Sequence, residues 1–176
     1  MRAKEKHLTD APSLRWVPIK GLKRAYELHA DRAMAGRIRW TKLLGSLAEA
    51  EYDGQQWTFK RRGFLRPRVT ARNPTSDAEL AVLELTWGGS GILAVHGGAR
   101  FRWQRLGFWG RRFAFAEESG LELISFEPKF GFVRRSGAVR THAKAAKLPE
   151  FGLLVTLGWY VLMLLADDEA AINAAG

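Results

Sequence analysis

The chain has 176 residues, of which 47% are hydrophobic and 26% are charged. This length and composition predict one folded domain with a sizeable core and exclude wholesale disorder. The formal net charge of +10 predicts affinity for polyanions such as nucleic acid, anionic lipid or an acidic partner, with solubility alone as the simpler explanation. No cysteine is present, which excludes disulfides, thiolate nucleophiles and cysteine metal sites.

The start of the chain is polar. Residues 1–13, MRAKEKHLTDAPS, lack the apolar segment of a signal peptide, so we expect a flexible tail on a cytoplasmic protein. Leu14–Leu22 carries Trp16, Val17 and Ile19, and we expect it to cover one end of the domain. The domain is predicted to span residues 14–170, followed by a C-terminal tail at 171–176.

From Ala25 onward, short segments with period-two alternation are separated by Gly, Pro, Asn or Asp, which is typical of β-strands. Asp53-Gly54 is a strong hairpin signal, and glycines at 97–98, 120 and 137 predict three more hairpin turns. The predicted strands are Ala25–Ala30, Ala33–Trp40, Ser46–Tyr52, Gln56–Arg62, Arg68–Arg72, Glu79–Trp87, Ile92–Val95, Arg100–Arg105, Phe113–Ala116, Leu121–Glu127, Phe130–Arg135 and Ala138–Thr141.

The segment Phe151–Ala166, FGLLVTLGWYVLMLLA, is uncharged and is followed by Asp167, Asp168 and Glu169. Its apolar residues fall on every side of a helical projection, which predicts a helix at 149–168 that is buried all round. A run of about 16 residues is roughly 24 Å long, whereas a membrane span needs about 20 apolar residues. We therefore interpret it as a core helix, with a C-terminal tail anchor as the minor alternative.

The strands and the helix together predict an all-β fold. We expect a closed antiparallel barrel of about twelve strands in meander order, because strands this regularly spaced favour a sandwich or a barrel. A barrel of more than about eight strands leaves a lumen that something must fill, and the helix supplies that filling. Gly152, Thr156 and Gly158 are small enough for side chains of the barrel wall to approach the helix.

Three stretches of the chain resemble the tubby C-terminal-like fold: YDGQQWTFKRRGFLRPRVTARN, FRWQRLGFWGRRFAFAEESG and the terminal LLVTLGWYVLMLLADD. The group includes tubby, phospholipid scramblases and plant LURP-one-related proteins. The resemblance covers Val17–Asp168 and is architectural. It implies a barrel around a C-terminal helix and, as in tubby, phosphoinositide headgroup binding by basic wall residues, which do not map one for one onto this chain. Scramblase-type regulation is not expected, since cysteine and an EF-hand-type acidic loop are missing.

Basic residues dominate between Trp57 and Arg112, where only Asp77, Glu79 and Glu84 oppose them. If the alternating aromatic residues face inward, most of the intervening basic side chains point outward. Arginine can donate two hydrogen bonds to one phosphate group. We therefore predict an anion-binding wall, against the alternative of an evenly solvated basic surface. Its candidates are Lys60, Arg62, Arg68, Arg72, Arg100, Arg102, Arg105, Arg111 and Arg112.

The aromatic residues of this region are expected to line the barrel, because they alternate along the predicted strands. Phe108-Trp109 breaks the alternation within the glycine-flanked sequence LGFWG. We therefore predict that Phe108 and Trp109 form an exposed loop that contacts a membrane or a partner.

Signatures of catalysis and metal binding are missing from the sequence. His7, His29, His96 and His142 are dispersed, and no nucleophile elbow, Walker loop or dinucleotide fingerprint occurs. We expect no cofactor and no metal. The predicted function is a non-enzymatic binding module for anionic phospholipid headgroups or another phosphate-bearing ligand at the inner membrane face. Nucleic-acid binding by the same wall and a structural role as a protein-interaction scaffold are the alternatives.

Overall fold

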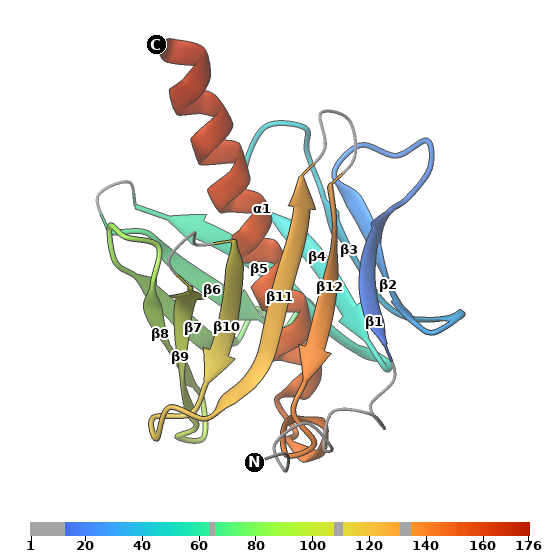
Figure 1. Cartoon of the computed structure of the whole chain (residues 1–176), viewed down its shortest axis with the longest axis vertical. Helices are drawn as coiled ribbons and strands as arrows, with labels where there is room; N and C mark the ends of the chain where they lie inside the picture. Colours follow the sequence, from blue (N-terminus) through green and yellow to red (C-terminus); the bar gives the residue numbers. More distant parts are fainter. Residues whose placement is uncertain (1–12, 64–65, 108–110, 131–134) are drawn as a thin grey trace, which may run out of the picture.

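The computed structural model describes residues 13–63, 66–107, 111–130 and 135–176. It is a closed antiparallel barrel of twelve strands around one C-terminal helix (Figure 1). The strands are β1 (Leu14–Pro18), β2 (Ala25–Ala30), β3 (Ala33–Trp40), β4 (Ala48–Tyr52), β5 (Gln55–Arg62), β6 (Arg68–Arg72), β7 (Glu79–Leu85), β8 (Gly91–Val95), β9 (Arg100–Leu106), β10 (Arg112–Ala116), β11 (Glu122–Phe130) and β12 (Arg135–Thr141). A short 3₁₀ helix, η1 (Ala145–Lys147), precedes α1 (Phe151–Ala175).

Each strand pairs with the next one along the chain, and β1 closes the barrel by pairing with β12, with Leu14 opposite Val139. Connections in such a meander alternate between the two ends of the barrel. We call the upper end the one that holds the β1–β2 connection, where α1 leaves the barrel, and the lower end the one where α1 begins (Figure 1). Each connection of the meander therefore belongs to one end, according to its order along the chain.

The barrel and its core helix confirm the predicted fold class, but three predicted elements are wrong. Leu14–Pro18 does not cover an end of the domain: it is strand β1, with Leu14 and Trp16 facing the core. Ser136-Gly137 is not a hairpin turn, because both residues lie inside β12. The predicted strand Phe130–Arg135 is wrong for the same reason: Phe130 ends β11 and Arg135 begins β12. Gly137 is needed in β12 for space, since a Cβ atom on it would lie 2.8 Å from Cζ3 of Trp159.

The helix α1 is buried from Gly152 to Leu164, which confirms the predicted core helix. By length and composition it could cross a membrane, yet 72% of its most apolar window is buried inside the barrel. It is longer than predicted and continues to Ala175, because Glu169 and the alanines that follow the apolar run favour helix. The predicted tail at 171–176 is therefore almost entirely helical.

Aromatic rings fill the space between the helix and the wall. The rings of Trp16 and Trp159 stack with centroids 5.8 Å apart, and those of Trp40 and Tyr160 stack at 5.5 Å. Gly158 faces Phe126 and Gly152 faces Tyr52 and Trp57, at distances that leave no room for a side chain on either glycine. The predicted role of both glycines in close packing is confirmed. This packing holds the helix in place, so the same residues always surround α1 where it leaves the barrel at the upper end.

Candidate functional site at the upper end of the barrel

The nine residues predicted to bind anions lie in two groups. Strands β7 and β8 separate the groups, and β7 carries the exposed Glu84 between them. The first group, on β5 and β6, comprises Lys60, Arg62, Arg68 and Arg72, and the second, on β9, β10 and the residue before β10, comprises Arg100, Arg102, Arg105, Arg111 and Arg112. The wall therefore does not present one continuous anion site.

Several of these arginines are already paired with acidic side chains. Four arginines make such ion pairs: Arg68 with Glu79 (3.5 Å), Arg72 with Asp77 (3.1 Å) and Glu79 (3.7 Å), Arg100 with Glu118 (3.4 Å) and Arg112 with Glu122 (2.9 Å). Within the described parts of the chain, Lys60, Arg62, Arg102, Arg105 and Arg111 make no ion pair. Only these five unpaired residues have their charge uncompensated by a neighbouring acid among the described residues. Three of them, Arg62, Arg105 and Arg111, lie toward the upper end.

The acidic residues of the connections lie at the lower end of the barrel. Every connection at the upper end (residues 19–24, 41–47, 63–67, 86–90, 107–111 and 131–134) is free of Asp and Glu in sequence. The described basic residues of these connections are Lys20, Lys23, Arg24, Lys42, Arg66 and Arg111. The lower connections instead contain Asp31, Asp53, Asp77, Glu117, Glu118 and Glu150. The lower connections also contain Arg32, Lys144 and Lys147 but stay net acidic, so the connections carry their net positive charge at the upper end of the barrel.

Inside the mouth of the barrel, three arginines hold the helix. Arg61 continues the inward-facing series of Trp57 and Phe59 and pairs with Asp168, while Arg24 and Arg135 both pair with Asp167, at 2.9 Å for Arg24. These arginines are half-buried. The two aspartates neutralise most of this inner set, so the uncompensated charge at the upper end belongs to the outer loops.

Arg24 also fixes the shape of the β3–β4 connection. Its Nη1 donates hydrogen bonds to the backbone carbonyls of Leu43 (3.0 Å) and Gly45 (2.9 Å), and its guanidinium lies 5.0 Å from the ring centre of Trp40. The Tyr160 hydroxyl donates to the carbonyl of Ser46 in the same connection. Burial raises the pKa of Tyr160, so this hydroxyl stays protonated and remains a donor well into the alkaline range. The loop is therefore tied to both the wall and the helix.

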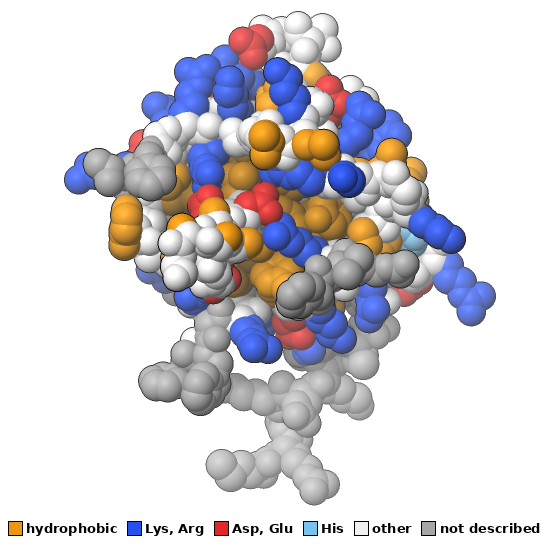
Figure 2. Space-filling view, turned by 90° about the horizontal axis from the view of Figure 1, so that it is seen from above, with side chains coloured by type: hydrophobic (Ala, Val, Ile, Leu, Met, Phe, Trp, Pro, Cys, Tyr) orange, Lys and Arg blue, Asp and Glu red, His pale blue; other side chains and the backbone are white. Residues whose placement is uncertain are grey.

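Large hydrophobic side chains are exposed around the upper end, between its basic residues (Figure 2). Leu44 is 88% exposed, Trp87 is 80% exposed and Ile172 is 72% exposed. The other exposed large hydrophobics at this end are Leu22, Leu43, Leu47 and Phe130. In the described part of the lower end, the corresponding residues are Met34 and Leu121 alone. We call the described residues of the upper connections, together with Phe130 at the end of β11 and Ile172 on α1, the upper rim.

Sequence reasoning singled out only part of this rim. Phe108 and Trp109, the predicted contact loop, lie outside the described residues. Leu43, Leu44 and the Arg24–Asp167 pair were missed. Trp87 was assigned to a strand, although β7 ends at Leu85 and Trp87 lies in the turn that follows. The available signal was the absence of acidic residues from every second connection.

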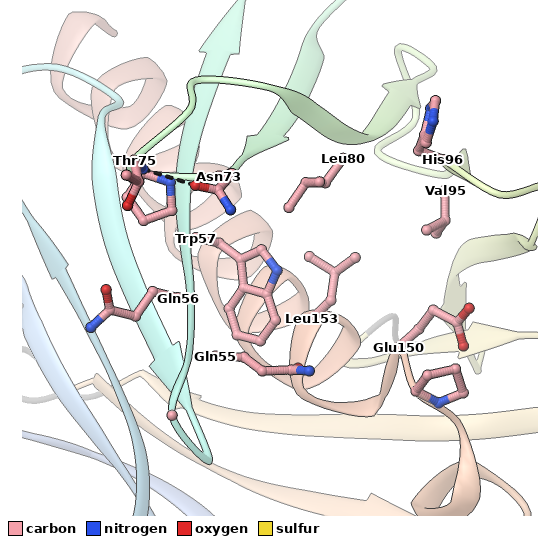
Figure 3. A pocket seen from close by; sticks show the side chains of 13 residues that line it. Gln55, Gln56, Trp57, Asn73, Thr75, Leu80, Val95, His96, Glu150 and Leu153 are labelled. Atoms are coloured by element: carbon pink, nitrogen blue, oxygen red, sulfur yellow. Dashed lines mark hydrogen bonds between the residues drawn. The ribbon is translucent and has the colours of Figure 1, made fainter.

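A cavity of about 530 Å³ opens at the lower end beside the start of α1 (Figure 3). Trp57, Leu80 and Leu153 supply its apolar lining, and neutral amides such as Gln55 stand at its edge. The side-chain oxygen Oδ1 of Asn73 accepts a hydrogen bond from the backbone N–H of Thr75, which holds the Asn73 side chain within its own turn. The lining contains no lysine or arginine, so this cavity lacks the groups that bind phosphate.

No group of three or more His, Asp or Glu side chains in the described ranges is placed to hold a metal ion. No protein-family model, curated protein or solved structure matches the chain.

Proposed function

We propose that this protein is a non-enzymatic binding module that adsorbs to anionic phospholipid surfaces through its upper rim. The observation that carries the proposal is the separation of charge along the barrel axis. The upper connections hold lysine and arginine without any acidic residue, and the lower connections hold both kinds of charge and are net acidic. A molecule of this polarity is attracted to a negatively charged plane in one orientation and is repelled in the opposite one.

The expected strength follows from the charges of the rim. A lysine or arginine at the surface of an anionic membrane contributes about 1 kcal/mol, and this attraction falls off within a Debye length of about 8 Å at physiological salt. Lys20, Lys23 and Lys42 are exposed in two neighbouring connections and make no ion pair with a described residue. Together with Arg66 and Arg111 they supply roughly 5 kcal/mol, which is enough for reversible adsorption and too little for permanent anchoring.

The wall arginines remain part of the proposal as secondary contacts. Arg62 and Arg105 end their strands toward the rim and can reach lipid phosphates when the rim rests on the surface. Arginine suits this role because its planar guanidinium donates two parallel hydrogen bonds to phosphate oxygens. The resemblance to tubby-like proteins supports the same ligand class.

The test is co-sedimentation of the full chain with vesicles of phosphatidylcholine alone and with added phosphatidylserine, at low and physiological salt. The variant Lys20→Glu/Lys42→Glu removes rim charge, and Arg32→Glu/Lys147→Glu is its matched control at the lower end. Both variants change the net charge equally. We expect the rim variant to lose at least about thirtyfold in affinity for the anionic vesicles and the control to keep most of its binding.

Equal losses in the two variants would show that only net charge matters, and an absence of wild-type binding to anionic vesicles would overturn the proposal. Arg102→Glu, in the middle of the wall, is expected to fold normally and to weaken binding less than the rim variant does. Nucleic-acid binding is the competing function. It predicts a salt-dependent mobility shift with DNA or RNA in a protein that leaves vesicles untouched.

A further inference from the structure

We infer that the upper rim does more than adsorb: its apolar side chains insert into the bilayer, so that the barrel stands with its axis close to the membrane normal. This inference rests on the proposed phospholipid binding and adds an orientation and a set of inserting residues. The inserting side chains are those of Leu43 and Leu44 in the β3–β4 connection, Trp87 in the β7–β8 connection and Ile172 on α1.

Hydrogen bonds to the backbone of the β3–β4 connection hold it in a conformation that exposes Leu43 and Leu44. The Arg24 guanidinium binds the carbonyl oxygens of Leu43 and Gly45, and Arg24 is itself paired with Asp167 of the helix. These bonds fix the backbone on either side of Leu44 while its side chain stays 88% exposed. The exposed leucines therefore stand on a loop whose backbone is held in place by Arg24.

The β7–β8 connection is fastened in a similar way. The backbone N–H of Thr86 donates to the carbonyl of Ser90 at 2.7 Å, and that of Gly89 donates to Thr86 at 3.0 Å. Gly89 has a φ of +79° and lies against Leu165 of the helix. Trp87 projects from this tight turn and is 80% exposed. Tryptophan is enriched at membrane interfaces because its ring is apolar and its N–H can still reach water or headgroups.

The helix end projects beyond the barrel between these two connections (Figure 1). After Glu169 the sequence AAINAAG contains no charged side chain. The stretch from Ala170 to Ala175 is about 9 Å long at helical rise. This length is short compared with the hydrocarbon core of about 30 Å, so the helix end enters the interface and does not span the bilayer.

A bilayer fits this surface better than a protein partner does, because of how the residues are distributed. The apolar tips stand on connections four strands apart, on either side of the helix, and lysines accompany them. Lys42 precedes Leu43, and Lys20 and Lys23 flank Leu22. This arrangement lets the apolar side chains enter the acyl region while the basic side chains stay at the level of the anionic headgroups. An anionic bilayer offers both the negative charge and the apolar interior that these side chains require.

The experiment compares Leu43→Ser/Leu44→Ser with Met34→Ser/Leu121→Ser, which removes exposed hydrophobics from the lower end. None of these side chains belongs to the core cluster, so both variants are expected to melt like the wild type. On phosphatidylcholine–phosphatidylserine vesicles at physiological salt, we expect about a tenfold or greater loss of affinity for the first variant. The second variant should bind like the wild type.

A direct readout of insertion uses the fact that the chain contains no cysteine. Leu44→Cys and Leu121→Cys each accept one environment-sensitive fluorophore. On vesicle binding we expect a blue shift and a rise in intensity at position 44 and no change at position 121. If the wild type binds anionic vesicles while position 44 stays in water and the serine variant keeps full affinity, insertion is refuted and adsorption stands. If the wild type does not bind at all, both proposals fall.

Discussion

Gly158 is the position where a single methyl group should do most damage to the fold. It lies in the middle of α1, and an added Cβ atom would be 2.2 Å from Cζ and 2.5 Å from Cε2 of Phe126. Ordinary contact requires about 3.4 Å or more, so the ring would have to retreat by more than 1 Å. Phe126 is 1% exposed and its ring lies 5.8 Å from that of Trp103, which blocks this retreat.

Two effects oppose each other in Gly158→Ala. Alanine is the better helix former, which would stabilise an exposed helix by about 1 kcal/mol. Overpacking a rigid core costs typically about 1–3 kcal/mol, and a contact this short lies toward the upper part of that range. The net expectation is a loss of about 1–2 kcal/mol. For a chain of this size, that loss lowers the melting temperature by roughly 2–8 °C.

The assay is thermal and urea unfolding followed by circular dichroism. Gly88→Ala is the control, because its added Cβ meets nothing within 4 Å and its expected effect is close to zero. In a double-mutant cycle, Gly158→Ala should cost less stability in the Phe126→Leu background than in the wild type, since leucine vacates the space that the methyl group needs. A higher melting temperature for Gly158→Ala than for the wild type would refute the close contact between the helix and the wall.

Two further predictions concern the same helix. Leu157→Asp should give no soluble folded barrel, because an unpaired carboxylate inside the core costs several kcal/mol; a soluble variant with a wild-type melting curve would contradict the position of the helix. The raised pKa of Tyr160 predicts that this residue makes a contribution to folding stability that is fully present below about pH 10 and declines as the pH rises further. The reason is that Tyr160 loses its hydroxyl proton at a lower pH in the unfolded chain than in the folded one. Tyr160→Phe should flatten that alkaline decline in urea unfolding, and an unchanged decline would assign it to other groups.

The barrel was predictable from sequence because each strand is buried on one face and marks its ends with turn residues. Period-two patterning together with flanking turn residues identified β2, β3 and β6 with the observed bounds. Strand β1 was missed because the six residues that connect it to its partner β2, IKGLKR, are not a tight hairpin turn, and because its other partner, β12, is far away in sequence. Gly137 read as a turn because sequence does not show that a tryptophan of the helix occupies the space beside it.

The candidate site was only partly predictable. The basic residues were visible, but the acids that neutralise four of them lie on neighbouring strands or turns whose register sequence does not fix. Arg24 and Asp167 are 143 positions apart, so nothing local connects them. The exposed apolar side chains were hidden for the opposite reason. A hydrophobic residue near a strand is read as part of that strand, as Trp87 was, and only the observed end of β7 places it in solvent.

The pairing of β1 with β12 also limits how other molecules can recognise this protein. An open sheet offers its edge strand as a template, and many domains capture extended peptides by adding them as a further strand. In the described barrel every strand already has two neighbours, so its backbone donors and acceptors are committed within the wall. A partner can address the protein only through side chains and loop tips. The barrel wall therefore cannot bind another chain by strand addition, and its binding must depend on the charge and polarity of the target.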